Sequence, residues 1–111
     1  MKVTITELVL KTPFHFFALS WHGLQILKQL KGTNYKAFKK TGIWTKHYTM
    51  TLWENEKDLK DFAASGAHLN SMKQSKKIAK SIKTLTINAN EMPSWKTAKQ
   101  LLESVKAIQF N

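Results

Sequence analysis

The sequence predicts a single α+β domain, in which an antiparallel sheet of four strands is combined with two crossing helices and one further helix at the end. Segments that alternate polar and apolar residues, as half-buried strands do, recur along the chain. Between them lie segments whose apolar residues recur every three or four positions, which is typical of amphipathic helices. The length of 111 residues and a hydrophobic content of 42% suit one folded domain that spans residues 1–111.

The first half of the chain predicts a strand, a long helix and two more strands. Residues 2–10 alternate β-branched apolar residues with polar ones, which predicts the first strand. Thr12 and Pro13 then form a typical helix start, and Gly32 provides a typical stop. Residues 35–43 and 44–54 predict two strands, with a bend or turn at Gly42.

The second half predicts a second crossing helix made of a short helix and a helical segment that follows it at once, then a fourth strand and a last helix. Asn55 followed by Asp58 resembles a capping box, and the helix after it stops at Ser65-Gly66. Residues 67–79 continue as a helix, and residues 81–89 alternate again as a strand. Pro93-Ser94 introduces the last helix. This order is the βαββαβ order of ferredoxin-like domains with an extra C-terminal helix.

Bulky residues occupy both faces of the strand predicted at 44–54. One face carries Trp44, Tyr48, Met50 and Leu52, and the other carries His47, Thr49, Thr51 and Trp53. Two crossing helices cover only one face of such a sheet. We therefore expect a second copy of the chain to cover the other face, so that two sheets close into a dimeric α+β barrel.

The charge and composition exclude several classes of function. The chain has 18 basic and 7 acidic residues, a net charge of +11, and every basic residue is Lys. Without Arg we expect no sequence-specific recognition of nucleic acid. The absence of Cys excludes disulfides and thiolate nucleophiles. The longest apolar run, residues 16–19, predicts no membrane span, and we expect a cytoplasmic protein without a signal peptide.

The candidate functional residues are histidines and aromatic residues. The four histidines, at positions 15, 22, 47 and 68, lack the spacing of metal ligands, so we expect no metal site. Glu7, within the first strand, lies either at the solvent edge or inside a pocket. The four tryptophans form either core or the walls of a pocket for a flat or elongated apolar ligand, with His22, His47 and His68 as its polar groups.

A family resemblance rests on the middle of the chain. Its residues are Thr49-Met50-Thr51-Leu52-Trp53-Glu54, Leu59, Phe62-Ala63, Ser65-Gly66-Ala67-His68, Met72 and Met92-Pro93-Ser94-Trp95. They resemble an uncharacterised bacterial family related to spheroidene monooxygenase. More widely, the chain is similar to the dimeric α+β-barrel proteins that include the antibiotic-biosynthesis monooxygenases. The tight part of the resemblance covers residues 49–95.

The resemblance implies a ferredoxin-like homodimer with a pocket between helices and sheet in each subunit. Relatives oxidise polycyclic aromatics without a cofactor, bind haem, or act on carotenoids. In the register that places Trp53 on the strand-end Trp of the haem-degrading relatives, Phe62 occupies the place of their haem-ruffling Trp. Met72 occupies the place of their iron-ligand His. These departures count against haem degradation. The sequence does not identify a cofactor: either none is required or haem is bound.

Three functional hypotheses follow from the sequence. The leading one is a homodimer that binds an apolar aromatic or isoprenoid-like molecule, with monooxygenase activity as its catalytic form. A histidine would then ionise a phenolic or enolic substrate, which in turn reduces dioxygen. The expected catalytic residues are His68, His22 and His47, and the expected substrate-binding residues are Trp21, Trp53, Tyr48, Phe62 and Met72. The alternatives are a non-catalytic binding or interaction protein that shares only the fold, and, with less support, a nucleic-acid binder.

His68 allows two interpretations of its own. It follows the Ser65-Gly66 break, where one helix stops and the next begins. At such a position its side chain either faces the mouth of a pocket or caps the helix junction.

Overall fold

The computed structural model of the chain describes residues 1–64 and 66–110, with the side chains of residues 67–72 outside the description. Its elements are β1 (Lys2–Leu10), the 3-10 turn η1 (Pro13–His15), α1 (Phe16–Leu30), β2 (Ala37–Ile43), β3 (Lys46–Trp53), α2 (Glu56–Ala63), α3 (Gly66–Ile78), β4 (Ala79–Asn88), α4 (Trp95–Leu102) and β5 (Ile108–Gln109). The predicted α+β fold with the ferredoxin-like order and the extra C-terminal helix is confirmed. The two-residue β5 was not predicted.

The sheet is antiparallel throughout, and β1 lies at its centre. In the part of the chain that the structure describes, its strand order is β2-β3-β1-β4-β5. Ile5 is paired with Met50 on β3 and with Leu85 on β4, so residues at these positions point to the same face. This register decides which side chains share each face of the sheet.

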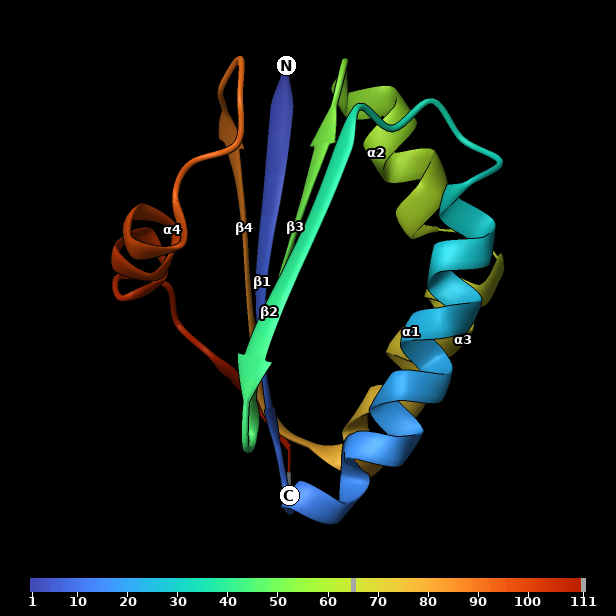
Figure 1. Ribbon diagram of the computed structural model, residues 1–111, viewed down its shortest axis with the longest axis vertical. Helices are drawn as coiled ribbons and strands as arrows, with labels where there is room; N and C mark the ends of the chain where they lie inside the picture. The colour runs from blue at the N-terminus through green and yellow to red at the C-terminus, as the bar shows by residue number, and fades with distance from the viewer. Residues whose placement is uncertain (65, 111) are drawn as a thin grey trace.

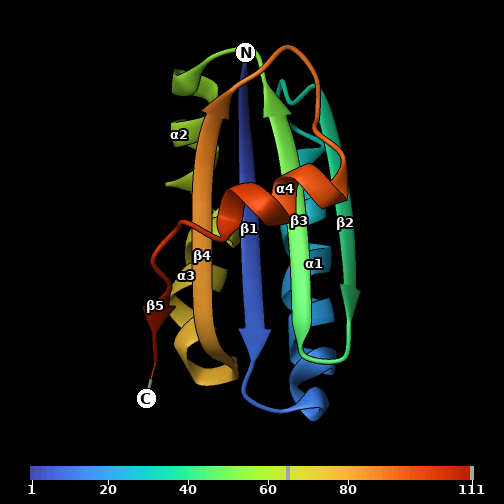
Figure 2. The same cartoon turned by 90° about the vertical axis from the view of Figure 1, so that its left-hand side faces the viewer.

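The two faces of the sheet are covered by different helices. Figure 1 shows α1, α2 and α3 on one side and α4 on the other, and Figure 2 shows α4 lying across the sheet with α1 and α3 behind it. We call these the helix side and the α4 side. The expectation that the second face is left bare by its own chain is wrong, because Ala98 and Leu102 of α4 pack against it.

Each side has its own apolar cluster. On the α4 side, Val3, Ile5 and Met50 are completely buried beneath α4. On the helix side, Trp53 packs with Leu30 of α1 and Phe62 of α2. The second cluster holds the C-terminal part of α1 to the sheet. The N-terminal part of α1 carries large apolar side chains that are exposed instead.

Side-chain caps fix the starts of two helices. The Asn55 side chain accepts a hydrogen bond from the backbone N–H of Asp58, as predicted for α2. The Ser94 hydroxyl accepts one from the backbone N–H of Thr97 at the start of α4. Such a cap satisfies a backbone donor that the first helical turn leaves free.

The β2–β3 turn differs from the predicted one. Gly42 lies within β2, and the turn is made by Trp44 and Thr45, since Ile43 is paired with Lys46. Trp44 has a φ of 60°, in the left-handed region that bulky residues rarely adopt. Sequence rules place a glycine at such a point, which is why the turn was expected two residues too early.

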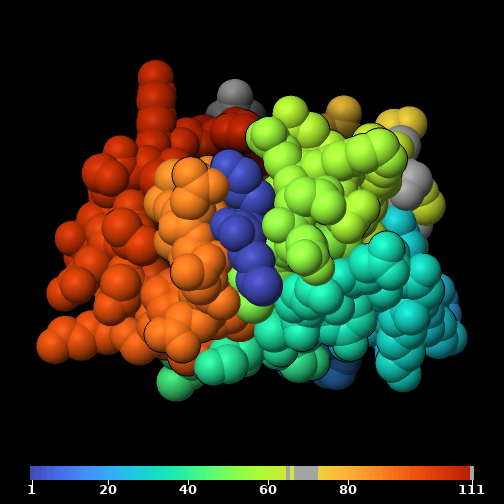
Figure 3. Space-filling model, turned by 90° about the horizontal axis from the view of Figure 1, so that it is seen from above, coloured from blue at the N-terminus to red at the C-terminus, as the bar shows by residue number. Residues whose placement is uncertain are grey.

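The two ends of the molecule are built differently. At the end that carries Met1, seen from above in Figure 3, the first strand lies between α2 with its preceding residues and the segment that leads to α4. At the opposite end, Leu10 donates to the Thr45 carbonyl at 2.8 Å and Lys11 donates to the Ile78 carbonyl at 2.9 Å. These bonds join the end of β1, just before η1, to the β2–β3 turn and the α3–β4 junction. We call this end of the molecule the hairpin end.

No helix among the described residues is long and apolar enough to cross a bilayer.

Candidate functional site

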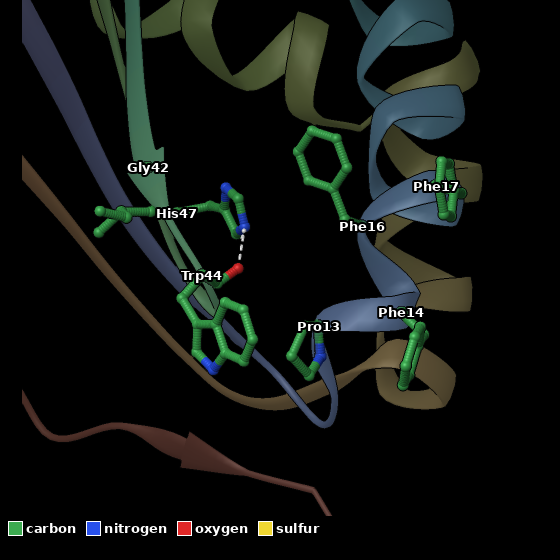
Figure 4. A pocket seen from close by; sticks show the side chains of 8 residues that line it. Pro13, Phe14, Phe16, Phe17, Gly42, Trp44 and His47 are labelled. Atoms are coloured by element: carbon green, nitrogen blue, oxygen red, sulfur yellow. Dashed lines mark hydrogen bonds between the residues drawn. The ribbon is translucent and has the colours of Figure 1, made fainter.

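An open hollow of about 640 Å³ lies at the hairpin end, between the start of α1 and the β2–β3 turn. We call it the hairpin hollow, and Figure 4 shows its lining from close by. It is lined by Pro13, Phe14, Phe16, Phe17, Gly42, Ile43, Trp44 and His47. Among these residues His47 alone carries an ionisable side chain, so the hollow is an apolar surface with a single titratable group.

The local sequence explains how the two walls of the hollow form. Thr12 and Pro13 follow the end of β1 and start η1. The phenylalanines after Pro13 therefore lie at the hairpin end. The Thr12 hydroxyl lies 2.9 Å from His15 Nδ1, which ties this turn together. The opposite wall is the tight β2–β3 turn, where the left-handed backbone of Trp44 leaves its ring 74% exposed. A bulky residue held in this conformation costs about 1–3 kcal/mol, and such strain is concentrated at functional sites.

The protonation pattern of His47 follows from its hydrogen bond. Nε2 lies 3.1 Å from the Trp44 carbonyl oxygen, and because a carbonyl can only accept, Nε2 donates. In the neutral imidazole Nδ1 is therefore the unprotonated nitrogen, and it lies against Gly42 of β2. The Phe16 ring lies 5.6 Å from the imidazole, centroid to centroid, and is tilted by 31°. The His47 ring is thus held in a fixed orientation beside an aromatic wall.

Gly42 makes room for the His47 ring. The two residues are directly opposite each other on β2 and β3. A Cβ atom at position 42 would collide with His47 Nδ1 and would stand 3.0 Å from Cγ. The glycine is therefore needed for the close approach of the ring to the strand, not for an unusual backbone angle.

A plane of threonines continues from His47 along the helix side of the sheet. Each of the three central strands contributes a Thr-x-Thr segment to it: Thr4 and Thr6 on β1, Thr49 and Thr51 on β3, and Thr84 and Thr86 on β4. The register aligns them in two rows of three. Thr49, Thr84 and Thr86 are exposed, and the Thr4 and Thr86 hydroxyl oxygens are 3.1 Å apart. This threonine plane offers hydroxyl donors and acceptors next to the apolar hollow.

Trp53 and Phe62, two of the predicted substrate-binding residues, lie together at the far end of the same face. Their ring centroids are 5.3 Å apart, and Trp53 is completely buried. Its indole Nε1 has no hydrogen-bond partner among the described residues. Six positions along β3 separate Trp53 from His47, which is roughly 20 Å in a strand. A small ligand in the hairpin hollow cannot contact both.

Tyr48 lies on the α4 side, away from every other predicted site residue that the structure describes. It is buried, and its ring centroid lies 6.4 Å from that of Trp95, with the two rings tilted by 56°. Burial, followed by a hydrogen bond with Glu7 and the charge of that carboxylate, raises the pKa of the Tyr48 phenol to about 12. Glu7 is half-buried in this pair on the α4 side. The structure thus separates Tyr48 from His47, its neighbour in sequence.

The remaining predicted residues are placed as follows. Trp21 and His22 belong to α1 and do not line the hairpin hollow; Trp21 is 62% exposed and His22 is half-buried. His68 and Met72 belong to α3, and their side chains lie outside the described residues. Among the described residues no group of three or more histidines and carboxylates could hold a metal ion.

Sequence reasoning missed most of the hollow and the whole threonine plane. A usable signal existed for the plane, since Thr-x-Thr occurs three times, each time in a predicted strand. The phenylalanines after Pro13 fall within the long helix that the sequence predicts between Pro13 and Gly32. Nothing local in the sequence indicates that the start of this helix meets the β2–β3 turn.

Several solved structures share the fold of this chain. A structure of an antibiotic biosynthesis monooxygenase matches with a TM-score of 0.71 at 9% identity, over 82% of this chain and 100% of the other. SnoaB, a cofactor-independent oxygenase from Streptomyces nogalater, matches with a TM-score of 0.62 at 7% identity, over 82% and 94%. A protein of unknown function from Nitrosomonas europaea matches with a TM-score of 0.65 at 13% identity, over 84% and 94%.

No protein-family model and no curated protein sequence matches the chain. At these identities the structural likeness establishes the fold alone, which agrees with the wider superfamily resemblance. The relation to spheroidene monooxygenase stays a prediction.

Proposed function

We propose that the protein binds a flat, oxygen-bearing polycyclic aromatic molecule in the hairpin hollow and oxidises it as a cofactor-independent monooxygenase. The observation that carries this proposal is the geometry of His47. Its imidazole lies against Phe16 in an apolar hollow, and its Nε2–H is held by the Trp44 carbonyl. That arrangement leaves Nδ1 as a base with a fixed direction.

The hollow suits this class of ligand in size and lining. Its volume of about 640 Å³ is within the range of ~300–1,000 Å³ that small-molecule sites occupy. Aromatic walls favour a flat ring system. The threonine plane begins next to His47. On β3 the next residue that points to the same face is Thr49, which is paired with Thr6 of β1. The hydroxyls of the plane suit phenol or quinone oxygens better than a pure hydrocarbon.

The proposed chemistry needs no metal or organic cofactor. His47 Nδ1 removes a proton from an acidic C–H or O–H of the substrate and leaves a delocalised carbanion or phenolate. This anion gives electrons to dioxygen, and a carbon–oxygen bond forms to give a hydroperoxide. Loss of water from the hydroperoxide converts a ring CH2 into a carbonyl. One oxygen atom of O2 enters the product, and the other leaves as water with the two hydrogens of the CH2.

The other predicted residues have a place in this proposal only with a longer ligand. Trp53 and Phe62 would contact a ligand that extends from the hollow along the whole threonine plane, as an elongated isoprenoid-like molecule does. Trp21 and His22 stay predicted site residues that do not line the hollow. His68 and Met72 stay predicted site residues whose side chains lie outside the described residues.

Oxygen uptake with a tricyclic anthrone as the probe tests the proposal. His47→Asn keeps an N–H for the Trp44 carbonyl and removes the base, so uptake should fall by about 100-fold or more, as loss of a general base does. Lys96→Gln is the control, because Lys96 is exposed on α4 and does not line the hollow. It should leave uptake within about twofold.

Two results of this experiment contradict the proposal in different ways. If the wild-type protein binds the anthrone but never consumes oxygen, the site is a binding site and the enzymatic part fails. If uptake is equal in wild type and His47→Asn, His47 is not the base.

We also propose that the protein is a homodimer joined through the α4 side. Leu85, Ile87, Trp95, Leu101 and Val105 around α4 are only partly buried, so this face retains apolar surface for a partner. Light scattering behind a sizing column should give twice the chain mass of 12.8 kDa at micromolar concentration. A mass of 12.8 kDa over the whole concentration range would contradict the dimer.

A further inference from the structure

Several large apolar side chains that are exposed lie around the hairpin end and along α1. Phe14 is 83% exposed, Phe17 78% and Ile43 82%, and they are joined by Trp44, Trp21 and Leu24. From Phe14 the stripe advances by three, four and three residues to Leu24, so its members share one face of η1 and α1. Scattered exposed apolar residues are ordinary, but a contiguous aromatic patch marks a binding surface.

Lysines surround this patch. Lys11 precedes η1, Lys46 follows the β2–β3 turn, and both are exposed. Lys76, Lys77 and Lys80, also exposed, flank the α3–β4 junction, which is hydrogen-bonded to Lys11 through Ile78. The patch and these lysines therefore belong to the same end of the molecule.

Carboxylates lie elsewhere. Between Glu7 and Glu54 the sequence has no Asp or Glu, and between Asp61 and Glu91 it again has none. Glu54, Glu56, Asp58 and Asp61 are grouped before and within α2, at the end that carries Met1, where Lys36, Lys57 and Lys60 are paired with three of them. At the hairpin end, by contrast, the exposed lysines have no Asp or Glu within three residues of them in the sequence; they are Lys11, Lys46, Lys76, Lys77 and Lys80.

We propose that the hairpin end is a docking surface for an anionic lipid bilayer. The aromatic and aliphatic tips enter the boundary between headgroups and acyl chains, and the lysines around them contact the anionic headgroups. Trp is the side chain best suited to that boundary, and Lys carries its charge on a flexible apolar stem that can reach the headgroups. The surface docks without any spanning segment.

A bilayer fits these observations better than a second copy of the chain. Two copies that met through this patch would bring Lys11 and Lys46 of each against the same lysines of the other, without a carboxylate nearby to compensate. A nucleic acid would use the lysines but leave Leu24 and Ile43 without a partner, since aliphatic tips do not stack on bases as aromatic rings do.

Docking would place the mouth of the hairpin hollow against the bilayer, because Phe14, Phe17, Ile43 and Trp44 belong to both. An apolar ligand could then pass from the bilayer into the hollow without crossing water. The docking itself depends on the exposed apolar side chains and the lysine charges. A result that contradicts the oxygenase chemistry therefore does not contradict the docking.

Sedimentation with vesicles tests the docking. The full-length protein is mixed with vesicles of phosphatidylcholine alone, or with about 30% phosphatidylglycerol, at about 0.1 M and 0.5 M salt. We expect binding to the anionic vesicles, at least tenfold weaker binding to the neutral ones, and a marked loss at high salt. Tryptophan emission should shift to shorter wavelength on binding, because Trp21 and Trp44 leave water.

Two pairs of variants separate the apolar and electrostatic contributions. Trp21→Gln with Leu24→Gln changes exposed patch residues that do not line the hollow, and should weaken binding at least tenfold. Lys11→Gln with Lys46→Gln should weaken it by up to about fivefold per lysine. The matched control is Lys96→Gln with Lys106→Gln, which removes the same charge from exposed positions outside the hairpin end. It should weaken binding by less than twofold.

Circular dichroism must show that each variant is folded. Three outcomes overturn the docking: no binding to anionic vesicles, equal losses for the two lysine pairs, or binding that Trp21→Gln with Leu24→Gln leaves unchanged. If that apolar pair instead dissolves a self-associated form of a protein that ignores vesicles, a second copy occupies the patch. Retention of RNA at about 0.2 M salt without vesicle binding would assign it to nucleic acid.

Discussion

The two faces of one sheet differ in what their alternate residues do. Val3, Ile5 and Met50 point to the α4 side, where α4 buries them completely. Their immediate neighbours Thr4 and Thr6 point to the helix side and contribute to the threonine plane. The same strands therefore contribute buried apolar residues to the core on one face and the threonine plane on the other. Stability and binding are separated by the period-two geometry of the strand.

The helices repeat this difference. α4 packs along its length on the sheet through Ala98 and Leu102. α1 is anchored at its C-terminal end by Leu30, whereas its N-terminal half exposes Phe17 and Trp21. A helix that is held at one end and apolar at the other leaves space for a ligand beneath it and a surface for a partner outside it.

The largest expected difference between the two faces concerns packing. Leu102→Ala removes a side chain that is 1% exposed beneath α4, and should lower the free energy of unfolding by about 2–5 kcal/mol. Leu24→Ala on α1 removes a side chain that is already half in water, and should change it by less than about 0.5 kcal/mol. Urea unfolding of both variants measures the two values. Equal losses would mean that α1 is packed as tightly as α4.

The buried phenol of Tyr48 on the α4 side should make the free energy of unfolding depend on pH in the alkaline range. Because burial and Glu7 raise its pKa from 10.0 to about 12, the folded protein holds the phenol proton more tightly than the unfolded chain. The stabilisation is complete below pH 10 and is lost as the pH rises from 10 to 12; it amounts to about 2 kcal/mol. Tyr48→Phe should lack this loss. Unfolding curves of both proteins across that range measure it, and parallel curves would contradict the pKa shift.

The variant Gly42→Ala tests the packing around His47 on the helix side of the sheet. In Gly42→Ala the new methyl group displaces the His47 ring, so anthrone binding or oxygen uptake should fall about tenfold or more. The free energy of unfolding should fall by about 1–3 kcal/mol, the usual cost of overpacking. Thermal melting and oxygen uptake on the same samples check both effects. A stable variant with wild-type uptake would show that the position of His47 is not needed.

The fold could be predicted from the sequence because each element has a strong local pattern. The first strand begins and ends where the alternation placed it, and the Asn55 and Ser94 caps occur where their spacing indicated. The β2–β3 turn was misplaced because Trp44, not Gly42, takes the left-handed backbone. Local preference assigns that conformation to glycine, and only the tertiary structure can hold a tryptophan there.

The candidate site was predicted less well, for two physical reasons. Tyr48 was grouped with His47 although strand alternation places adjacent residues on opposite faces, and the structure shows this separation. Phe16 and His47 are brought together only by the meeting of η1 with the β2–β3 turn, a contact across thirty residues that no local pattern encodes. The prediction for His68 stays open, since its side chain lies outside the described residues.

The smallest expected effect concerns the threonine plane. It distinguishes threonines that bind the ligand through their hydroxyls from threonines that only separate the helices from the sheet. Thr86→Val keeps the shape of the side chain and removes the hydroxyl that lies 3.1 Å from that of Thr4. Because Thr86 is exposed, the free energy of unfolding should change by less than about 0.5 kcal/mol. If the hydroxyls bind ligand oxygens, hydroxyanthraquinone affinity should fall about three- to tenfold, as the loss of one hydrogen bond predicts.

Thr41→Val is the control, because Thr41 is paired with Tyr48 and shares its face on the α4 side. Calorimetric titration of both variants should therefore give a loss for Thr86→Val alone. Equal affinities would show that the ligand is held by the apolar walls and that the threonines only space the helices from the sheet.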